Sequence, residues 1–237
     1  MISKNKEIRH LVIGAGEVGR AIHEILKKKH SVSLRDKDDD ASGRFEVIHV
    51  CYPPVKDFFK ITKDYIRQYQ PKLIIVHSTV PVGMTRRLGL NAVHSPIRGV
   101  HPHLVKGIMT FVKYFGGPRA KEAASYFAAV GIKTMVSLKS ETTELLKILD
   151  TTYYGWNIVF CKEAKRICDK FGLDFDVIYA SANSDYNSGY SKLGMKNVVR
   201  PVLKPMTGKI GGHCVIQNTF LLKDWLTDTL RKRNSDY

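Results

Sequence analysis

Three glycines in the pattern Gly-x-Gly-x-x-Gly offer the first recognisable chemistry in the chain, the binding of a diphosphate. Gly14, Gly16 and Gly19 follow an apolar run over 8–13, and a helix expected over 17–29 begins inside the motif. This strand–turn–helix context is the one that a dinucleotide fingerprint requires. Gly14 would turn the chain off the strand, Gly16 would leave room for phosphates, and Gly19 would let the helix pack closely on the strand.

The residues after the next apolar run, 31–34, indicate which dinucleotide is bound. The phosphates would lie at the start of the helix, beside Glu17 and Val18, where unpaired N–H groups favour negative charge. Asp36 follows about 20 residues after the motif, and its carboxylate would accept hydrogen bonds from the ribose hydroxyls and repel a 2′-phosphate. We therefore predict NAD as the cofactor. Arg35 keeps NADP open, because an arginine there would instead hold the extra phosphate.

The elements that must position this site are alternating strands and helices. Helices are expected over 55–69 and 118–130, and apolar runs typical of strands lie at 45–50, 72–77, 91–94, 111–115 and 132–136. The alternation predicts an α/β fold with a Rossmann-type, doubly wound, mostly parallel sheet. Ligands bind at the carboxyl edge of such sheets. Tyr52 and Pro53 follow the third run and Ser78 and Thr79 follow the fourth, so we expect all four beside the cofactor.

The pattern becomes helical after residue 138, which predicts a cofactor domain over 1–138 and a helical domain over 139–237. A helix over 140–171 would be about 45 Å long at 1.5 Å per residue, typical of a domain spine or a dimer interface. Cys161 and Cys168 share one face of it and are expected to be packing residues. A helix over 174–182, a long ordered loop over 183–212 and a C-terminal helix over 215–230 complete the expectation.

Composition limits the choice of partners and location. The 237 residues carry a formal net charge of +16, which suits nucleic acid, a small anionic substrate or simply a solvated surface. The basic residues are spread along the chain without a stripe interleaved with aromatics, so nucleic acid is not favoured. We see no secretory signal, no apolar run of the roughly 20 residues that span a bilayer and no metal-ligand pattern. The spacing of the four cysteines does not match a disulfide framework, which suggests a reducing compartment, so we expect a cytoplasmic protein.

Four further segments resemble one family, the NAD-dependent nucleotide-sugar 6-dehydrogenases of the UDP-glucose, UDP-N-acetylhexosamine and GDP-mannose types. They are Val50-Cys51-Tyr52-Pro53-Pro54, Ser78-Thr79-Val80-Pro81-Val82-Gly83-Met84-Thr85-Arg86, Glu144-Leu145-Leu146-Lys147 and Gly211-Gly212-His213-Cys214. The resemblance implies that two NAD molecules oxidise a primary alcohol, in a small anionic substrate such as a nucleotide sugar, to a carboxylate through a covalent thioester. We expect a 6-phosphogluconate-dehydrogenase-like arrangement, and the length of the helix over 140–171 favours a homodimer formed through it.

The resemblance gives roles to single residues. Cys214 would be the nucleophile, and its expected position at a helix N-terminus would favour the thiolate that attacks an aldehyde. Lys147 would stabilise an oxyanion as a fixed positive charge. Thr79 would order a water molecule or the nicotinamide end of the cofactor.

The sequence departs from the family pattern at several positions. Asn218 stands where the family has an aspartate, and because an amide is no base, the hydrolysis of a thioester is open to question. Thr151 replaces an asparagine, and Ile97 replaces a glutamate. The family also continues with a further nucleotide-binding domain beyond the point where this sequence stops, which leaves the substrate open.

Two alternatives remain at this point. The segment Gly99-Val100-His101-Pro102-His103 is similar to one in prephenate-type dehydrogenases, which would use His101 or His103 as an acid or base together with Lys147 and no covalent step. The chain could also be a non-catalytic NAD-binding module.

Overall fold

A computed structural model describes residues 8–37, 39, 41–99, 102–212 and 214–237. The chain divides into two compact units, Met1–Lys147 and Ile148–Tyr237. The long helix that begins at Ser140 crosses this division, so its first two turns belong to the first unit. Each unit is described by itself.

The first unit is built on a seven-stranded sheet with the order β2-β1-β3-β4-β5-β6-β7. Neighbouring strands are parallel except for β5 and β6, which pair antiparallel at His94 and Gly116. The predicted mostly parallel α/β sheet is therefore confirmed. Its strands are β1 Arg9–Ile13, β2 Ser31–Arg35, β3 Val47–Val50, β4 Leu73–Val76, β5 Ala92–His94, β6 Lys113–Gly116 and β7 Thr134–Ser137.

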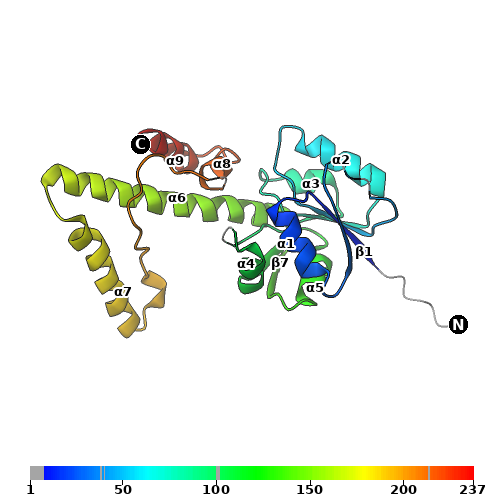
Figure 1. Ribbon diagram of the computed structural model, residues 1–237, viewed down its shortest axis with the longest axis horizontal. Helices are drawn as coiled ribbons and strands as arrows, with labels where there is room; N and C mark the ends of the chain where they lie inside the picture. The colour runs from blue at the N-terminus through cyan, green and yellow to red at the C-terminus, as the bar shows by residue number, and fades with distance from the viewer. Residues whose placement is uncertain (1–7, 38, 40, 100–101, 213) are drawn as a thin grey trace. The chain divides into compact units, whose positions relative to one another are not determined.

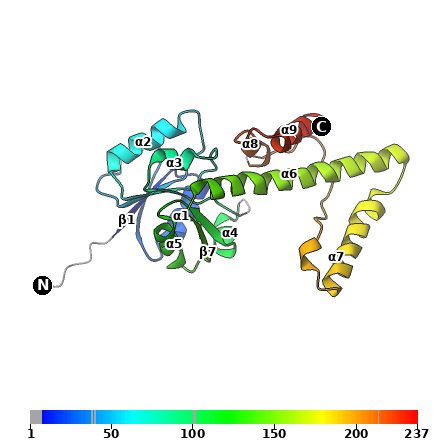
Figure 2. The same cartoon turned by 180° about the vertical axis from the view of Figure 1, so that it is seen from behind.

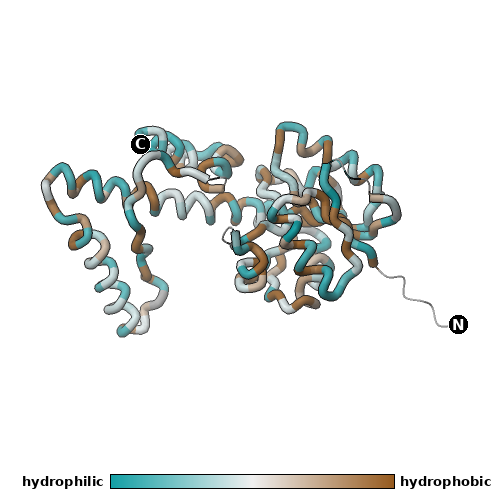
Figure 3. The backbone as a smooth tube through the Cα atoms, viewed as in Figure 1, coloured by the Kyte–Doolittle hydropathy of each residue, from teal (hydrophilic) through white to brown (hydrophobic). Residues whose placement is uncertain are grey.

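Helices cover both faces of this sheet (Figures 1 and 2). One face packs against α1 (Glu17–Leu26), α4 (Leu104–Thr110) and α5 (Ala120–Ala128), and the other against α2 (Phe58–Tyr69) and α3 (Met84–Leu88). Figure 3 shows the hydrophobic segments of this unit concentrated in its strands. Strands buried on both faces read as continuous apolar runs, which is why their positions could be read from the sequence.

The second unit contains the rest of α6 (Ser140–Phe171), the longest helix. This helix has the bounds that the sequence predicts. Cys161 and Cys168 are buried with Phe175 and Tyr179, which confirms the two cysteines as packing residues. The unit also contains a π-helix η1 (Asp176–Ser181), a 3-10 helix η2 (Lys196–Val198) and the α-helices α7 (Ala182–Lys192), α8 (Val215–Thr219) and α9 (Trp225–Ser235).

Two sequence predictions in this unit are wrong. Residues 183–192, expected to begin a loop, belong to α7 (Ala182–Lys192), although none of its side chains is buried. Asn187 explains part of this, because its amide donates to Arg200 O at 2.9 Å and accepts from Arg200 N at 2.8 Å. The expected helix over 215–230 is two helices, α8 and α9, and Asp224 caps the second by accepting from Leu226 N–H.

None of the helices in the described part of the chain combines the length and apolar character that crossing a membrane requires.

Candidate cofactor and active site

The glycine motif forms the turn between β1 and α1. Gly14 has φ +102°, a conformation that favours glycine, and its N–H donates to Arg35 O at 2.9 Å. A Cβ on Gly14 would lie 3.0 Å from Tyr52 N, and a Cβ on Gly19 would lie 1.7 Å from Gly14 O. Both glycines therefore allow backbone segments to approach closely, and the approach places the segment after β3, with Tyr52 and Pro53, against the turn.

The space in front of this turn suits a diphosphate. A Cβ on Gly16 would meet no heavy atom within 4 Å. Helix α1 begins at Glu17 with Gly16 as its N-cap, and no side chain caps it. The first N–H groups of a helix have no partner within the helix. Because the side chain of Val18 packs on the core, the motif presents backbone amides to this space.

Arg35 is the last residue of β2 and Asp36 follows it, and the contacts of the two side chains differ. Asp36 is exposed, and its carboxylate accepts from Lys37 N–H at 3.0 Å. Arg35 is only 6% exposed: its guanidinium donates to Tyr69 Oη at 2.6 Å and packs over the ring of Tyr65. An arginine bound in this way is not directed at a 2′-phosphate, and the role of Asp36 at the ribose stays a prediction.

The loop after β4 is held by the first turns of α6. Glu144 is fully buried, and its two carboxylate oxygens accept from Gly83 N–H at 2.6 Å and from Thr85 N–H at 2.8 Å. Burial raises the pKa of Glu144, while the hydrogen bonds to Thr85 and Gly83 lower it. Glu144 is the first residue of the Glu-x-x-Lys segment, but the sequence alone assigns it no role. The structure shows that it fixes the Ser-Thr-Val-Pro loop to the helix that carries Lys147.

The same carboxyl edge holds further predicted residues. Ser78 Oγ donates to Tyr52 O at 2.6 Å, and His94 Nε2 donates to Ser78 O at 3.2 Å. Burial, partly offset by the hydrogen bond to Ser78 O and reinforced by the charges of Lys113 and Lys147, lowers the pKa of His94 to about 3, so its ring is neutral. The charge of Lys147 acts on His94 at this edge, and Thr79 directly follows Ser78 on the loop that Glu144 holds.

The remaining predicted residues lie in the second unit. Cys214 is exposed and is the N-cap residue of α8. Because α8 spans only five residues, it does not supply the long helix dipole that the sequence argument invoked. Asn218 is 7% exposed, and its amide donates to Thr151 Oγ1 at 3.3 Å. Asn218 and Thr151, the residues that replace the aspartate and the asparagine of the family pattern, are thus hydrogen-bonded to each other.

Of the two histidines of the second alternative, the structure describes one. His103 is exposed and is the N-cap of α4. His101 and His213 lie outside the described residues.

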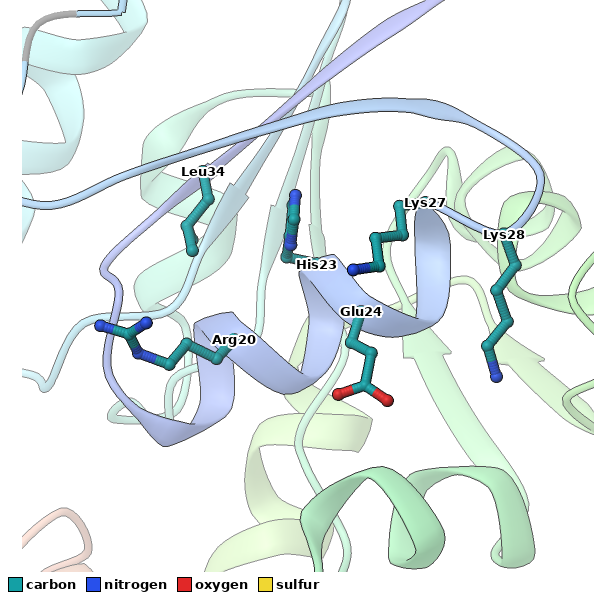
Figure 4. Close-up of a pocket in the computed structure, with 6 residues that line it drawn as sticks. All are labelled: Arg20, His23, Glu24, Lys27, Lys28 and Leu34. Atoms are coloured by element: carbon teal, nitrogen blue, oxygen red, sulfur yellow. The ribbon is translucent and has the colours of Figure 1, made fainter.

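A separate surface hollow of about 540 Å³ lies on the outer side of α1 (Figure 4). Its lining is mostly basic and comprises Arg20, His23, Glu24, Lys27, Lys28 and Leu34. These residues come from the body of α1 and from β2 rather than from the glycine turn, so the hollow is not the expected cofactor site.

The fold and the glycine turn define a Rossmann-type unit followed by a helical unit. Residues 141–230 match the central domain of the UDP-glucose/GDP-mannose dehydrogenase family. UDP-N-acetyl-D-mannosamine dehydrogenase of Methanococcus maripaludis is 27% identical over 154 residues, which cover 60% of this chain and 33% of that protein. The Methanocaldococcus jannaschii enzyme of the same name is 27% identical over 156 residues, with the same coverage.

Solved structures show the same fold. UDP-D-ManNAc dehydrogenase of Pyrococcus horikoshii has a TM-score of 0.79 at 17% identity, over 96% of this chain and 68% of that one. A UDP-glucose dehydrogenase of Pyrobaculum islandicum has a TM-score of 0.76 at 15% identity, over 100% of this chain and 70% of that one. A 3-hydroxyisobutyrate dehydrogenase of Mycobacterium tuberculosis has a TM-score of 0.69 at 15% identity, over 97% of this chain and 93% of that one. The predicted resemblance to the NAD-dependent nucleotide-sugar dehydrogenases is confirmed, and the chain spans about a third of the curated relatives.

Proposed function

We propose that this chain supplies the cofactor-binding and central-helix portion of an NAD-dependent nucleotide-sugar 6-dehydrogenase. The observation that carries the proposal is the buried Glu144 carboxylate, which bonds to Gly83 N–H and Thr85 N–H. This contact joins two motifs of the family, the Ser-Thr-Val-Pro loop and the Glu-x-x-Lys helix, around the carboxyl edge of one sheet. The edge is where a doubly wound sheet binds its ligand.

The residues of the first unit fit NAD. The amides at Gly16, Glu17 and Val18 would bind the diphosphate, and Asp36 would accept from the ribose hydroxyls. Gly14 and Gly19 shape the turn, and Tyr52, Pro53, Ser78 and Thr79 would border the nicotinamide half. When bound, NAD supplies the acceptor for the hydride.

The residues that would act on the substrate are Thr79, Lys147 and Cys214. Lys147 would hold the negative charge that develops on the substrate oxygen, and Thr79 would order a water molecule. The Cys214 thiolate would add to the aldehyde carbon and form a carbon–sulfur bond. After oxidation the product is a thioester, which water cleaves to release the carboxylate and the thiol.

Asn218 bears on this last step. A carboxylate at this position could take a proton from water, whereas the Asn218 amide, which donates to Thr151, cannot. We expect hydrolysis to be slow, so that the acylated Cys214 accumulates. The same pair favours the second candidate, an NAD-binding module that does not complete the oxidation.

The test is NADH formation from NAD and a panel of nucleotide sugars by the wild type and by Cys214→Ser, with Cys168→Ala as the control for a buried thiol. We expect activity that Cys214→Ser abolishes and Cys168→Ala retains, and a covalent adduct on Cys214 in the intact-mass spectrum. Equal activity in Cys214→Ser would overturn covalent catalysis. NAD binding without NADH formation across the panel would favour the non-catalytic module.

A further inference from the structure

A row of buried imidazoles crosses the sheet of the first unit. His10 lies on β1, His49 on β3 and His77 directly after β4, with exposed fractions of 0%, 0% and 2%. In the strand register His10 pairs with Val47, two residues before His49, and His49 pairs with Ile75, two residues before His77. The three rings, here called the imidazole row, therefore step toward the carboxyl edge on one face of the sheet.

The rings contact one another directly. His10 Nδ1 lies 3.0 Å from His49 Nε2, and His49 Nδ1 lies 3.1 Å from His77 Nε2. These are hydrogen-bond distances, and they leave no space for a metal ion between the nitrogens. Phe127 of α5 covers the row, with its ring 6.0 Å from His49 and 5.7 Å from His77. The row is thus a hydrogen-bonded chain that α5 shields from water.

The carboxyl-edge end of the row sets the position of every proton in it. His77 Nδ1 lies 2.9 Å from Ser95 O, and a carbonyl oxygen can only accept, so this nitrogen carries the hydrogen. In a neutral ring His77 Nε2 then accepts from His49 Nδ1–H. By the same rule His49 Nε2 accepts from His10 Nδ1–H. This leaves a lone pair on His10 Nε2, a buried atom without a partner among the described residues.

Lys113 stands at the carboxyl-edge end of the row and is only 4% exposed. Its Nζ lies 3.4 Å from His77 Nδ1, 3.2 Å from Ser95 O and 3.4 Å from Pro96 O. A neutral amine can accept from His77 Nδ1–H, whereas an ammonium has three hydrogens for these three neighbours. Burial, partly offset by Cys51, lowers the pKa of Lys113 to about 7, so both forms exist near neutrality.

The charge therefore belongs on Lys113 and not on the rings. Burial lowers the pKa of His10 to about 4 and holds those of His49 and His77 well below the usual value. The other ionisable groups that influence or contact the row or Lys113 are Glu46, His30, His94, Cys51, Lys147 and Tyr126, whose ring lies 4.7 Å from that of His10. Of these, Glu46 and His30 act at the His10 end, where the His30 ring packs 5.0 Å from that of His10.

We propose that the imidazole row and Lys113 form a proton relay, a buried site that passes one proton between the His10 end of the row and Lys113 at the carboxyl edge. A proton that binds His10 Nε2 displaces the proton on His10 Nδ1 to His49 Nε2. The proton on His49 Nδ1 moves to His77 Nε2, and the proton on His77 Nδ1 moves to Lys113 Nζ.

One proton enters and one is delivered in this sequence, and every ring ends neutral with its hydrogen on Nε2. Lys113 becomes an ammonium, and the direction of both hydrogen bonds between the rings is reversed. The His77–Ser95 contact loses its hydrogen, so the 2.9 Å separation belongs to the form with neutral Lys113. The relay requires neither NAD nor substrate and is independent of the function proposed above.

The test is a pH titration of the unliganded chain labelled with ¹⁵N-histidine, in which two-bond ¹H–¹⁵N spectra report which ring nitrogen carries hydrogen. As the pH falls through about 7, the pKa of Lys113, we expect His49 and His77 to change together from the Nδ1–H to the Nε2–H form. Neither ring should become an imidazolium. The wild-type titration alone can overturn the relay. It would do so if the two rings changed at separate midpoints, if neither changed form, or if either became an imidazolium.

Variants at two lysines add the control. In Lys113→Met both rings should keep the Nδ1–H form over the whole titration, because no base remains at the end of the row. Lys133→Met is the matched control, since Lys133 is exposed and its carbonyl oxygen accepts from Lys113 N–H. It should titrate as the wild type does. A Lys113→Met protein that changes form as the wild type does would contradict the proposal.

Discussion

Glu144 is the single residue on which the predicted loop geometry depends most. Its carboxylate satisfies two backbone N–H groups inside the first unit. In Glu144→Gln the amide can accept from only one of them and presents an NH₂ group to the other. An unsatisfied buried donor costs about 1–3 kcal/mol, so we expect a loss of that size in the free energy of unfolding by urea.

Glu141→Gln is the matched control. Glu141 lies one turn earlier on α6 and pairs with Arg86 at 2.9 Å, but Arg86 is 75% exposed. Exposed ion pairs contribute about 0–1 kcal/mol. Equal losses in the two variants would show that Glu144 does not fix the loop.

Lys113 should give the stability of the chain a distinct pH dependence. Its pKa is 10.5 when unfolded and about 7 when folded, so between these values the unfolded chain binds more protons. Stability therefore rises with pH across this range, by up to about 1.4 kcal/mol per pH unit. Urea unfolding at several pH values should show this rise in the wild type and in Lys133→Met, and a shallower slope in Lys113→Met. Identical slopes in all three proteins would refute the assignment.

At the scale of elements, the strand–turn–helix at the start of the chain depends on Gly19. A Cβ there would lie 1.7 Å from Gly14 O, a backbone atom that cannot move without moving the turn. Overpacking of this kind costs about 1–3 kcal/mol or more. We expect Gly19→Ala to lower the free energy of unfolding by at least that amount and to weaken NAD binding.

Gly189→Ala serves as the comparison for this glycine. Gly189 lies within α7, and a Cβ there would meet no heavy atom within 4 Å. Alanine is favoured over glycine in a helix by up to about 1 kcal/mol, so stability should stay equal or rise. Parallel losses in Gly19→Ala and Gly189→Ala would contradict the close approach at the turn.

The elements also show how far the sequence could predict the structure. The buried strands and α6 were predictable because continuous apolar runs and a long proline-free segment leave few alternatives. Helices α3 and α4 were missed because five and seven residues carry too little periodicity. Helix α7 was missed because Asn, Ser and Gly favour loops, whereas contacts such as Asn187–Arg200 are visible only in three dimensions.

The same limit applies to the site. The turn formed by Gly14, Gly16 and Gly19 was predictable from spacing, since the fingerprint depends on local backbone, whereas the role of Asp36 stays a prediction. The imidazole row was not predictable, although a histidine in each of four apolar strands was a visible signal: His10, His49, His77 and His94 all end or interrupt such runs. Only the strand register brings three of these rings into hydrogen-bond distance.

At the scale of the whole molecule, we expect a homodimer formed through α6. Five apolar residues recur at spacings of four or seven on one side of this helix and are exposed by 39% to 66%: Leu149, Tyr153, Phe160, Ile167 and Phe171. An apolar stripe of this kind marks an interface. Sedimentation should show a dimer for the wild type and for Lys165→Asp, which lies away from the stripe, and a monomer for Phe160→Asp. A monomeric wild type, or a dimeric Phe160→Asp, would refute this interface.

The most direct test of the account is NAD binding measured by calorimetry in the wild type and in Gly16→Val. Gly16 has φ −69°, which valine adopts freely, and a Cβ there contacts no atom of the chain. The valine would fill only the space assigned to the diphosphate. We predict that the melting temperature stays unchanged, that NAD affinity falls at least about tenfold, equivalent to about 1.4 kcal/mol, and that the wild type binds NAD more tightly than NADP. Equal NAD affinity in the two proteins would contradict the assigned site.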